Sequence, residues 1–199
     1  MNSPEPGQVD RHMRIPKIFR SSDTGKLFEH CMICDRFLLN EGTPYMIEKA
    51  VKQYPELKVK EVIFEYAICF NCALMMNESL SFESRQRINA YFERHGNWVE
   101  RRERLLQHKT TRVEPWINRC LIKGTPISKS TEFQLAAQCD GKYLLFTYLP
   151  FALSAEALDE ITSLLSPKSL GEIDDFMGNY FSGPPEIAEL LKRRPLVLV

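Results

Sequence analysis

Residues 31–72 read CMICDRFLLNEGTPYMIEKAVKQYPELKVKEVIFEYAICFNC, and this stretch begins and ends with a pair of cysteines. The first pair is Cys31 and Cys34, and the second is Cys69 and Cys72. In a Cys-x-x-Cys pair the intervening residues form a tight turn, which lets two sulfur atoms reach one metal ion. Two such pairs supply the tetrahedral set of four thiolates that zinc prefers in structural sites. The sequence therefore predicts one structural Zn²⁺ bound by these four residues, which we call the cysteine cluster.

The alternative is that these residues are ordinary buried thiols or a redox pair. The chain has no apolar run of the roughly 18–20 residues that a membrane-spanning helix needs. Its first residues, MNSPEPGQVDRHMR, also lack the apolar stretch of a secretory signal. We therefore expect a cytoplasmic protein that does not enter a membrane. In that reducing compartment, paired cysteines favour metal binding over disulfides, and a redox motif would need only one pair.

Short apolar segments lie between and after the two cysteine pairs. Residues 45–51 and 62–68 have the character of strands, and a turn at residues 54–56 would join them as a β-hairpin. The residues after Cys69 favour a helix. Ser81 is a good N-cap for a further helix, and Gly96 is a natural end for it.

A cysteine knuckle, a hairpin and a helix that carries the last two ligands resemble the treble-clef group of zinc folds. The resemblance covers residues 28 to about 95 and rests on cysteine spacing and element order. It implies an α+β fold whose metal has no open coordination position. Such a metal holds the fold and does not perform hydrolysis.

The second half of the chain repeats part of this pattern. Cys31-Met-Ile-Cys34 aligns with Cys120-Leu-Ile-Lys123, and Cys69-Phe-Asn-Cys72 aligns with Cys139-Asp-Gly-Lys142. An ammonium group cannot bind zinc, so we expect the second copy to be degenerate and metal-free. The alignment shortens the hairpin of the second copy strongly, which leaves chance similarity as the alternative.

The predicted fold class is therefore α+β, with two tandem small treble-clef-like units that each contain a zinc knuckle, a β-hairpin and a helix. We expect a flexible tail over residues 1–24 and a zinc-binding unit with a basic helical extension over residues 25–112. The degenerate copy and a C-terminal helix that starts at Pro184 or Pro185 would occupy residues 113–199.

The degenerate copy raises the question of thiol reactivity. If Cys120 and Cys139 lie close together, Lys123 and Lys142 could lower the pKa of their thiols. The alternative is two buried thiols with both lysines in solvent.

Charge and motifs restrict the function. The chain has 26 Lys plus Arg and 26 Asp plus Glu, so it has no overall attraction to nucleic acid or to an anionic membrane. It contains no Gly-rich phosphate loop, no GxSxG and no HExxH, and we expect no catalytic activity. The expected function is a protein-interaction or scaffold module, with a protein partner or self-association.

The alternative function is nucleic-acid binding through the basic stretch of residues 85–119, which has nine Lys or Arg and four Glu. The residues that could neutralise phosphates are Arg101, Arg102, Arg104, Lys109 and Arg112. Glutamates alternate with these arginines at spacings that would pair on a helix, which favours a solvated charged face.

Overall fold

The computed structural model of the chain describes residues 12–54, 56–57, 59–107 and 112–181. Its centre is a six-stranded sheet in which five strands follow the order β1-β5-β4-β2-β3, and β6 also pairs with β4. All of the pairings between these strands are antiparallel. The strands are β1 (His12–Arg14), β2 (Pro44–Tyr54), β3 (Val59–Cys69), β4 (Glu132–Asp140), β5 (Tyr143–Leu145) and β6 (Phe151–Ser154).

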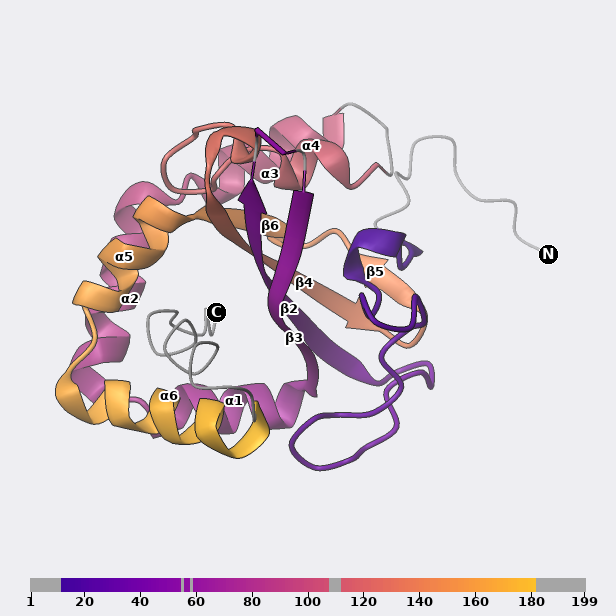
Figure 1. The fold of residues 1–199 in the computed structure, drawn as a ribbon, viewed down its shortest axis with the longest axis horizontal. Coiled ribbons are helices and arrows are strands. Elements are labelled where there is room, and N and C mark those ends of the chain that lie inside the picture. Colours follow the sequence, from indigo (N-terminus) through magenta and orange to yellow (C-terminus); the bar gives the residue numbers. More distant parts are fainter. Residues whose placement is uncertain (1–11, 55, 58, 108–111, 182–199) are drawn as a thin grey trace.

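Helices surround this sheet, so the expected mixed α+β class is confirmed. They are α1 (Phe70–Ser79), α2 (Phe82–His95), α3 (Trp98–Gln107), α4 (Glu114–Ile117), α5 (Ala155–Ser163) and α6 (Pro167–Tyr180), with the short 3-10 helices η1 (Lys17–Phe19) and η2 (Ile127–Lys129). Figure 1 shows α1 and α6 at one end of the sheet, α2 and α5 along one side, and α3 and α4 at the other end. None of the described helices has both the length and the apolar character needed to cross a membrane.

The expected hairpin is formed by β2 and β3. Tyr45 lies opposite Cys69 at one end of the hairpin, and Tyr54 lies opposite Val59 at the other. Strand β2 is buried along most of its length, and β3 is buried over its last residues, which lead into Cys69. The hairpin therefore delivers Cys69 to the point where β3 meets α1.

The boundaries of α2 are those that the sequence predicted. The Ser81 side chain accepts a hydrogen bond from the backbone N–H of Ser84, which satisfies one of the free donors at the helix start. At the other end, Gly96 is the C-cap, and its N–H bonds to the carbonyl of Phe92.

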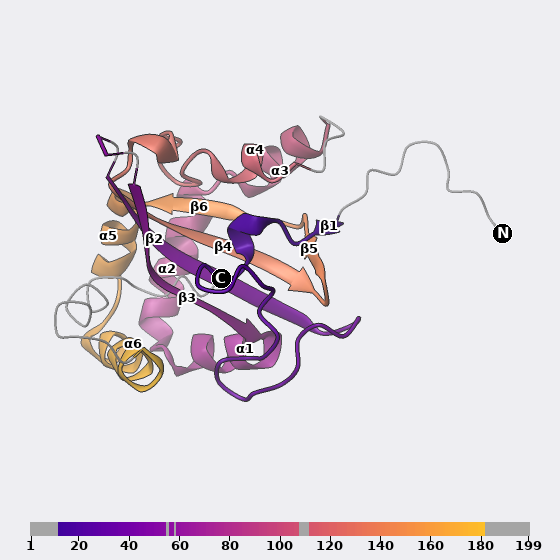
Figure 2. The same cartoon turned by 45° about the vertical axis from the view of Figure 1, so that its right-hand side comes forward.

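The two halves of the chain share one sheet. Strand β2 of the first half pairs with β4 of the second, from Pro44 opposite Asp140 to Lys52 opposite Glu132 (Figure 2). One hydrophobic core contains buried residues from both halves, among them Ile47 and Ala137, each 0% exposed. The expected arrangement of two tandem units is not confirmed, because the predicted boundary at residue 113 does not separate two cores.

The N-terminal segment is more ordered than expected over its described part. The flexible tail was predicted to reach residue 24, but β1 pairs with β5, and Ile15 and Phe19 are 1% and 0% exposed. These apolar side chains belong to the hydrophobic core, which local sequence does not reveal. Residues 1–11 and the predicted C-terminal helix lie outside the described residues.

Candidate metal centre

The first cysteine pair lies in a tight turn before β2. The backbone N–H of Cys31 bonds to the carbonyl of Arg36 (2.8 Å), and the N–H of Asp35 bonds to the carbonyl of Cys31 (2.9 Å). Asp35 has a positive φ of 58°, which a tight turn of this kind requires and which Asp tolerates better than most residues. The second pair lies at a strand-to-helix corner, where Cys69 ends β3 and Cys72 is in the first turn of α1.

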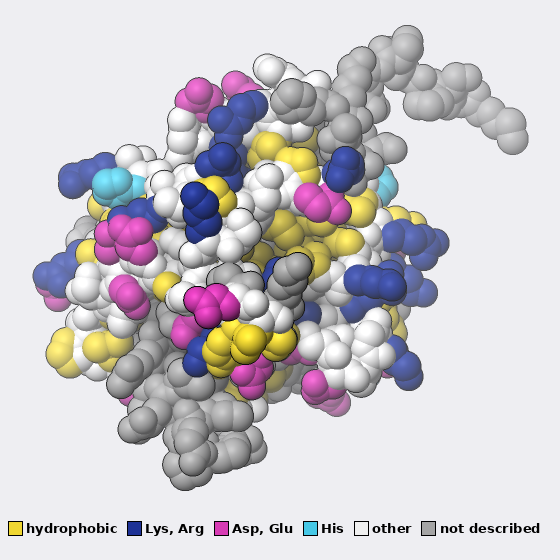
Figure 3. Space-filling model, turned by 45° about the horizontal axis from the view of Figure 1, so that its top comes forward, with side chains coloured by type: hydrophobic (Ala, Val, Ile, Leu, Met, Phe, Trp, Pro, Cys, Tyr) yellow, Lys and Arg dark blue, Asp and Glu magenta, His cyan; other side chains and the backbone are white. Residues whose placement is uncertain are grey.

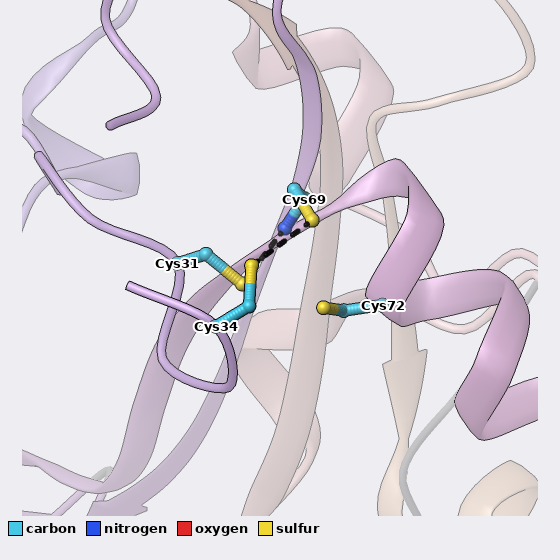
Figure 4. A group of neighbouring side chains, drawn as sticks. All are labelled: Cys31, Cys34, Cys69 and Cys72. Atoms are coloured by element: carbon cyan, nitrogen blue, oxygen red, sulfur yellow. Dashed lines mark hydrogen bonds between the residues drawn. The ribbon is translucent and has the colours of Figure 1, made fainter. Parts of the chain in front are cut away.

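Two hydrogen bonds hold the turn against this corner. The N–H of Met32 donates to the carbonyl of Ala67 (2.9 Å), and the N–H of Cys69 donates to the Sγ of Cys31 (3.3 Å). The first bond joins the turn to the backbone of β3, an edge strand of the sheet, and the second reaches a sulfur atom directly. Figure 4 shows the four sulfur atoms converging from the turn, the strand end and the helix.

The geometry of the cysteine cluster fits one metal ion. Its four sulfur atoms all lie within 4.8 Å of one another, and the Sγ atoms of Cys34 and Cys69 are 3.7 Å apart. A tetrahedral zinc ion with Zn–S bonds of about 2.3 Å separates its sulfur ligands by about 3.8 Å. Cys31, Cys69 and Cys72 are buried, and Cys34 is exposed. The structure therefore brings together the four cysteines that the sequence singled out, and they could bind a metal ion.

The electrostatics of the cluster favour a cation. Burial alone would raise the pKa of the Cys31 thiol, but hydrogen bonds from the backbone of Cys34, Cys69 and Ile33 outweigh it and lower this pKa to about 7. Burial raises the pKa of Cys69 and of Cys72, and the neighbouring sulfur atoms raise the pKa of Cys72 further. Like charges this close cannot all ionise alone, so a bound cation is what would let four thiolates coexist.

The residues expected to form the degenerate site do not gather as the four cysteines do. The Sγ of Cys120 accepts hydrogen bonds from the N–H of Lys123 (3.4 Å) and from the N–H of Ser154 (3.3 Å). Cys139 instead lies within β4, opposite Tyr45 on one side and Leu144 on the other. Lys142 is exposed in the turn that follows β4. Among the described residues, the cysteine cluster is the only group of at least three Cys, His, Asp or Glu with metal-binding geometry.

Lys123 is bound by acidic side chains that lie far from it in the sequence. Its Nζ lies 3.3 Å from a carboxylate oxygen of Glu156 and also pairs with Glu160, and the Tyr91 hydroxyl donates to Glu160. Glu156 and Glu160 are four residues apart in α5, a spacing that places both on one face of a helix. The sequence shows that the two glutamates share a helix face, but only the fold shows that Lys123 is their partner.

We expect Cys120 and Cys139 to resist alkylation in the folded protein. They are 2% and 0% exposed, so neither sulfur atom is accessible to the reagent, and burial also raises the pKa of the Cys139 thiol. Iodoacetamide labelling followed by peptide mass spectrometry would measure this, with the protein in denaturant as the control in which both cysteines react. Labelling of either cysteine in the native state at the rate of a free thiol would show that it is activated.

Part of the basic stretch contacts the protein's own backbone. The Arg101 guanidinium donates to the carbonyls of Trp116 (2.5 Å), Pro150 (2.9 Å) and Tyr148 (3.2 Å), and burial together with Arg104 lowers its pKa to about 10. Arg101 therefore stabilises its own chain. Figure 3 shows Lys and Arg side chains in several separate places on this end of the molecule, with acidic and apolar side chains between them.

Two other members of the basic stretch contact neighbouring side chains. Arg102 lies over the ring of Tyr148, and Arg112 is 3.4 Å from a carboxylate oxygen of Glu114. Lys109 lies outside the described residues.

Comparison with known proteins gives no relative for this fold or its metal centre. No family model, no curated protein and no solved structure matches the chain.

Proposed function

We propose that the chain is a structural-zinc protein that acts as a protein-interaction or scaffold module, without catalytic activity. The observation that carries the proposal is the position of the cysteine cluster at the start of α1. Cys69 is the N-cap of this helix and Cys72 is its third residue, so a metal bound there would fix how α1 leaves the sheet. The cytoplasm is the compartment in which four such thiols stay reduced.

Zinc is the metal that suits this set of ligands. Four thiolates form a soft donor set, which selects zinc over magnesium or calcium, and no protein position is left open for water or substrate. A closed shell of this kind acts through structure and not through chemistry. Elemental analysis together with native mass spectrometry would test this part, and we expect one zinc per chain.

The outer face of α1 supports an interaction role. Phe70, Leu74 and Met75 are 40%, 49% and 66% exposed, and we call these three side chains the α1 surface. Glu78 is the only charged residue of this helix. Neighbouring exposed apolar side chains on a rigid element are typical of a surface that another protein covers. The nucleic-acid alternative has weaker support, because Arg101 is engaged by backbone carbonyls.

The same proposal includes the finer fold of two related treble-clef-like units, the second without metal. The hydrogen bonds of the turn at Cys31 recur at Cys120, which supports a common origin for both. The unit that keeps its metal is then the one that carries the α1 surface.

We expect L74D/M75D to weaken partner binding strongly while leaving the fold and the zinc content unchanged. Both side chains are exposed, so their replacement leaves the core intact, whereas a charge inside an apolar interface removes about 2 kcal/mol or more, which is roughly a 30-fold loss of affinity. Affinity capture with quantitative mass spectrometry from cells would compare this variant with wild type. The matched control is V99D on α3, where the replaced residue is 59% exposed and lies away from the α1 surface. Equal capture by wild type and L74D/M75D would contradict the proposal.

A further inference from the structure

The turn at Cys31 and the turn at Cys120 have the same internal hydrogen bonds. The matching pairs are Cys31 N to Arg36 O and Cys120 N to Thr125 O, both 2.8 Å, and Asp35 N to Cys31 O and Gly124 N to Cys120 O, both 2.9 Å. The fifth residue of each turn has a positive φ, 58° at Asp35 and 65° at Gly124. The second turn is therefore a knuckle of the same shape.

Each turn also contacts a strand end in the same way. Met32 N bonds to Ala67 O (2.9 Å), and Leu121 N bonds to Ala152 O (2.8 Å). The next contact joins a strand end to the first sulfur. Cys69 N donates to Cys31 Sγ and Ser154 N donates to Cys120 Sγ, and both N–S distances are 3.3 Å.

These contacts identify the residue that corresponds to Cys69. Cys69 ends β3 and is the N-cap of α1, and Ser154 ends β6 and is the N-cap of α5. Three residues further on, Ala157 takes the position of Cys72. Lys123, three residues after Cys120, takes the position of Cys34.

The sheet obeys the same correspondence. Tyr45 lies opposite Cys69 in the hairpin of β2 and β3, and Phe133 lies opposite Ser154 in the antiparallel pair of β4 and β6. In the central pair of strands, Tyr45 faces Cys139 and Val51 faces Phe133, as a two-fold axis between β2 and β4 requires.

The starts of α2 and α6 meet about this axis. Ser81 and Ser166 are the N-caps of the two helices, and their hydroxyl oxygens are 2.9 Å apart. The backbone N–H of Ser81 donates to Ser169 Oγ (2.9 Å), and the N–H of Ser166 donates to Ser84 Oγ (2.8 Å). The two helix starts therefore make the same backbone-to-serine hydrogen bond to each other in both directions.

We propose that Cys120, Lys123, Ser154 and Ala157 occupy the four ligand positions of a second tetrathiolate metal site that has lost three of its ligands. This set replaces the one aligned from sequence, in which Cys139 and Lys142 stood for the second cysteine pair. The sequence alignment placed the second pair after β4, whereas the chain returns through β5 and β6 before it reaches the equivalent corner.

The state of these four residues agrees with a converted metal site. Ser154 is 4% exposed, and its Oγ has no hydrogen-bond partner in the described structure, as for a hydroxyl left where a metal ligand stood. Ala157 is 0% exposed, so this position faces the protein interior, as a metal ligand would. The Nζ of Lys123 puts a positive charge near the former site, and Glu156 and Glu160 bind it. The second half therefore keeps its knuckle without a metal.

The test is to rebuild the site as K123C/S154C/A157C. Titration with Co²⁺, followed by thiolate-to-cobalt absorption and d–d bands, is expected to show two metal equivalents per chain, where wild type shows one. The matched control is K123C/K142C, which restores the four ligands aligned from sequence and is expected to bind one equivalent. The wild-type cysteine cluster is present in every variant and serves as the internal standard.

Three results would overturn the proposal. One is a folded triple variant that binds a single Co²⁺, and another is a second equivalent bound by K123C/K142C. The third applies if the triple variant does not fold. S154C/A157C keeps Lys123 and its ion pairs and supplies three thiols, so we expect it to bind a second Co²⁺ more weakly than the cysteine cluster binds the first. A folded S154C/A157C that binds no second Co²⁺ would overturn the proposal. None of these results depends on a protein partner.

Discussion

Removal of the metal from the cysteine cluster is expected to unfold the hairpin of β2 and β3 and the start of α1. Structural zinc contributes on the order of 10–16 kcal/mol to folding in small zinc-binding peptides, which matches or exceeds the net stability of about 5–15 kcal/mol of most domains. Because β2 is also the partner of β4, loss of the hairpin would extend to the shared sheet. Hydrogen exchange and circular dichroism after chelation would measure the loss.

Substitution gives the same test without a chelator. C69S removes one ligand and is expected to abolish metal binding and cooperative unfolding near the wild-type temperature. C139S is the matched control, because Cys139 is a fully buried cysteine outside the cluster and its loss leaves the metal in place. A C69S variant as stable as C139S would show that the metal does not hold the fold.

E65Q is expected to destabilise the protein by about 3–5 kcal/mol, because it removes one partner of a buried ion pair. The Lys49 Nζ lies 2.8 Å from Glu65, and the two side chains are 5% and 13% exposed. Lys49 also donates to the carbonyl of Arg20 and to the hydroxyl of Ser22, so the pair ties the N-terminal segment to the hairpin. Without the carboxylate, Lys49 would stay buried with its charge uncompensated. Urea unfolding would measure the change.

Two further variants separate the charge effect from general damage. E83Q breaks the exposed pair of Glu83 with Arg87, and we expect a change of at most about 1 kcal/mol. K49M/E65L removes both buried charges and is expected to recover part of the stability that E65Q loses. If E65Q destabilised no more than E83Q, the buried pair would have no structural role.

The same pair has a predictable pH dependence. Burial alone would raise the pKa of Glu65, but hydrogen bonds from Lys49 and from Ser22 lower it below its usual value. A carboxyl whose pKa is lower in the folded state stabilises the fold above the pKa of the unfolded chain, about 4.3 for Glu. This stability is lost as the pH falls through the folded pKa. Wild type should therefore lose more stability than E65Q on acidification.

The sequence predicted what local pattern determines. The cysteine spacing identified the cluster, the alternating residues of 62–68 identified β3, and Ser81 and Gly96 identified the limits of α2. Each of these signals depends on neighbours within a few positions.

What the sequence did not predict depends on distant contacts. Nothing local shows that β2 pairs with β4, or that Ile15 and Phe19 enter the core, because both depend on tertiary packing. The helix α6 was missed although Ser166 and Pro167 form a good start signal, and the Ser166 side chain does accept from the N–H of Ser169. The sequence alignment matched Cys139 with Cys69 because both are cysteines. It missed Ser154, which has the equivalent position in the fold but is no longer a cysteine.

The pairing of β2 with β4 bears on how the chain can be divided. If the polypeptide were cut between its halves and only the first were produced, β2 would become an outermost strand with a bare row of amide and carbonyl groups. Such an edge invites association with any similar edge, including that of an identical fragment. Keeping both halves on one polypeptide makes the correct neighbour always present, and so protects the centre of the sheet from aggregation.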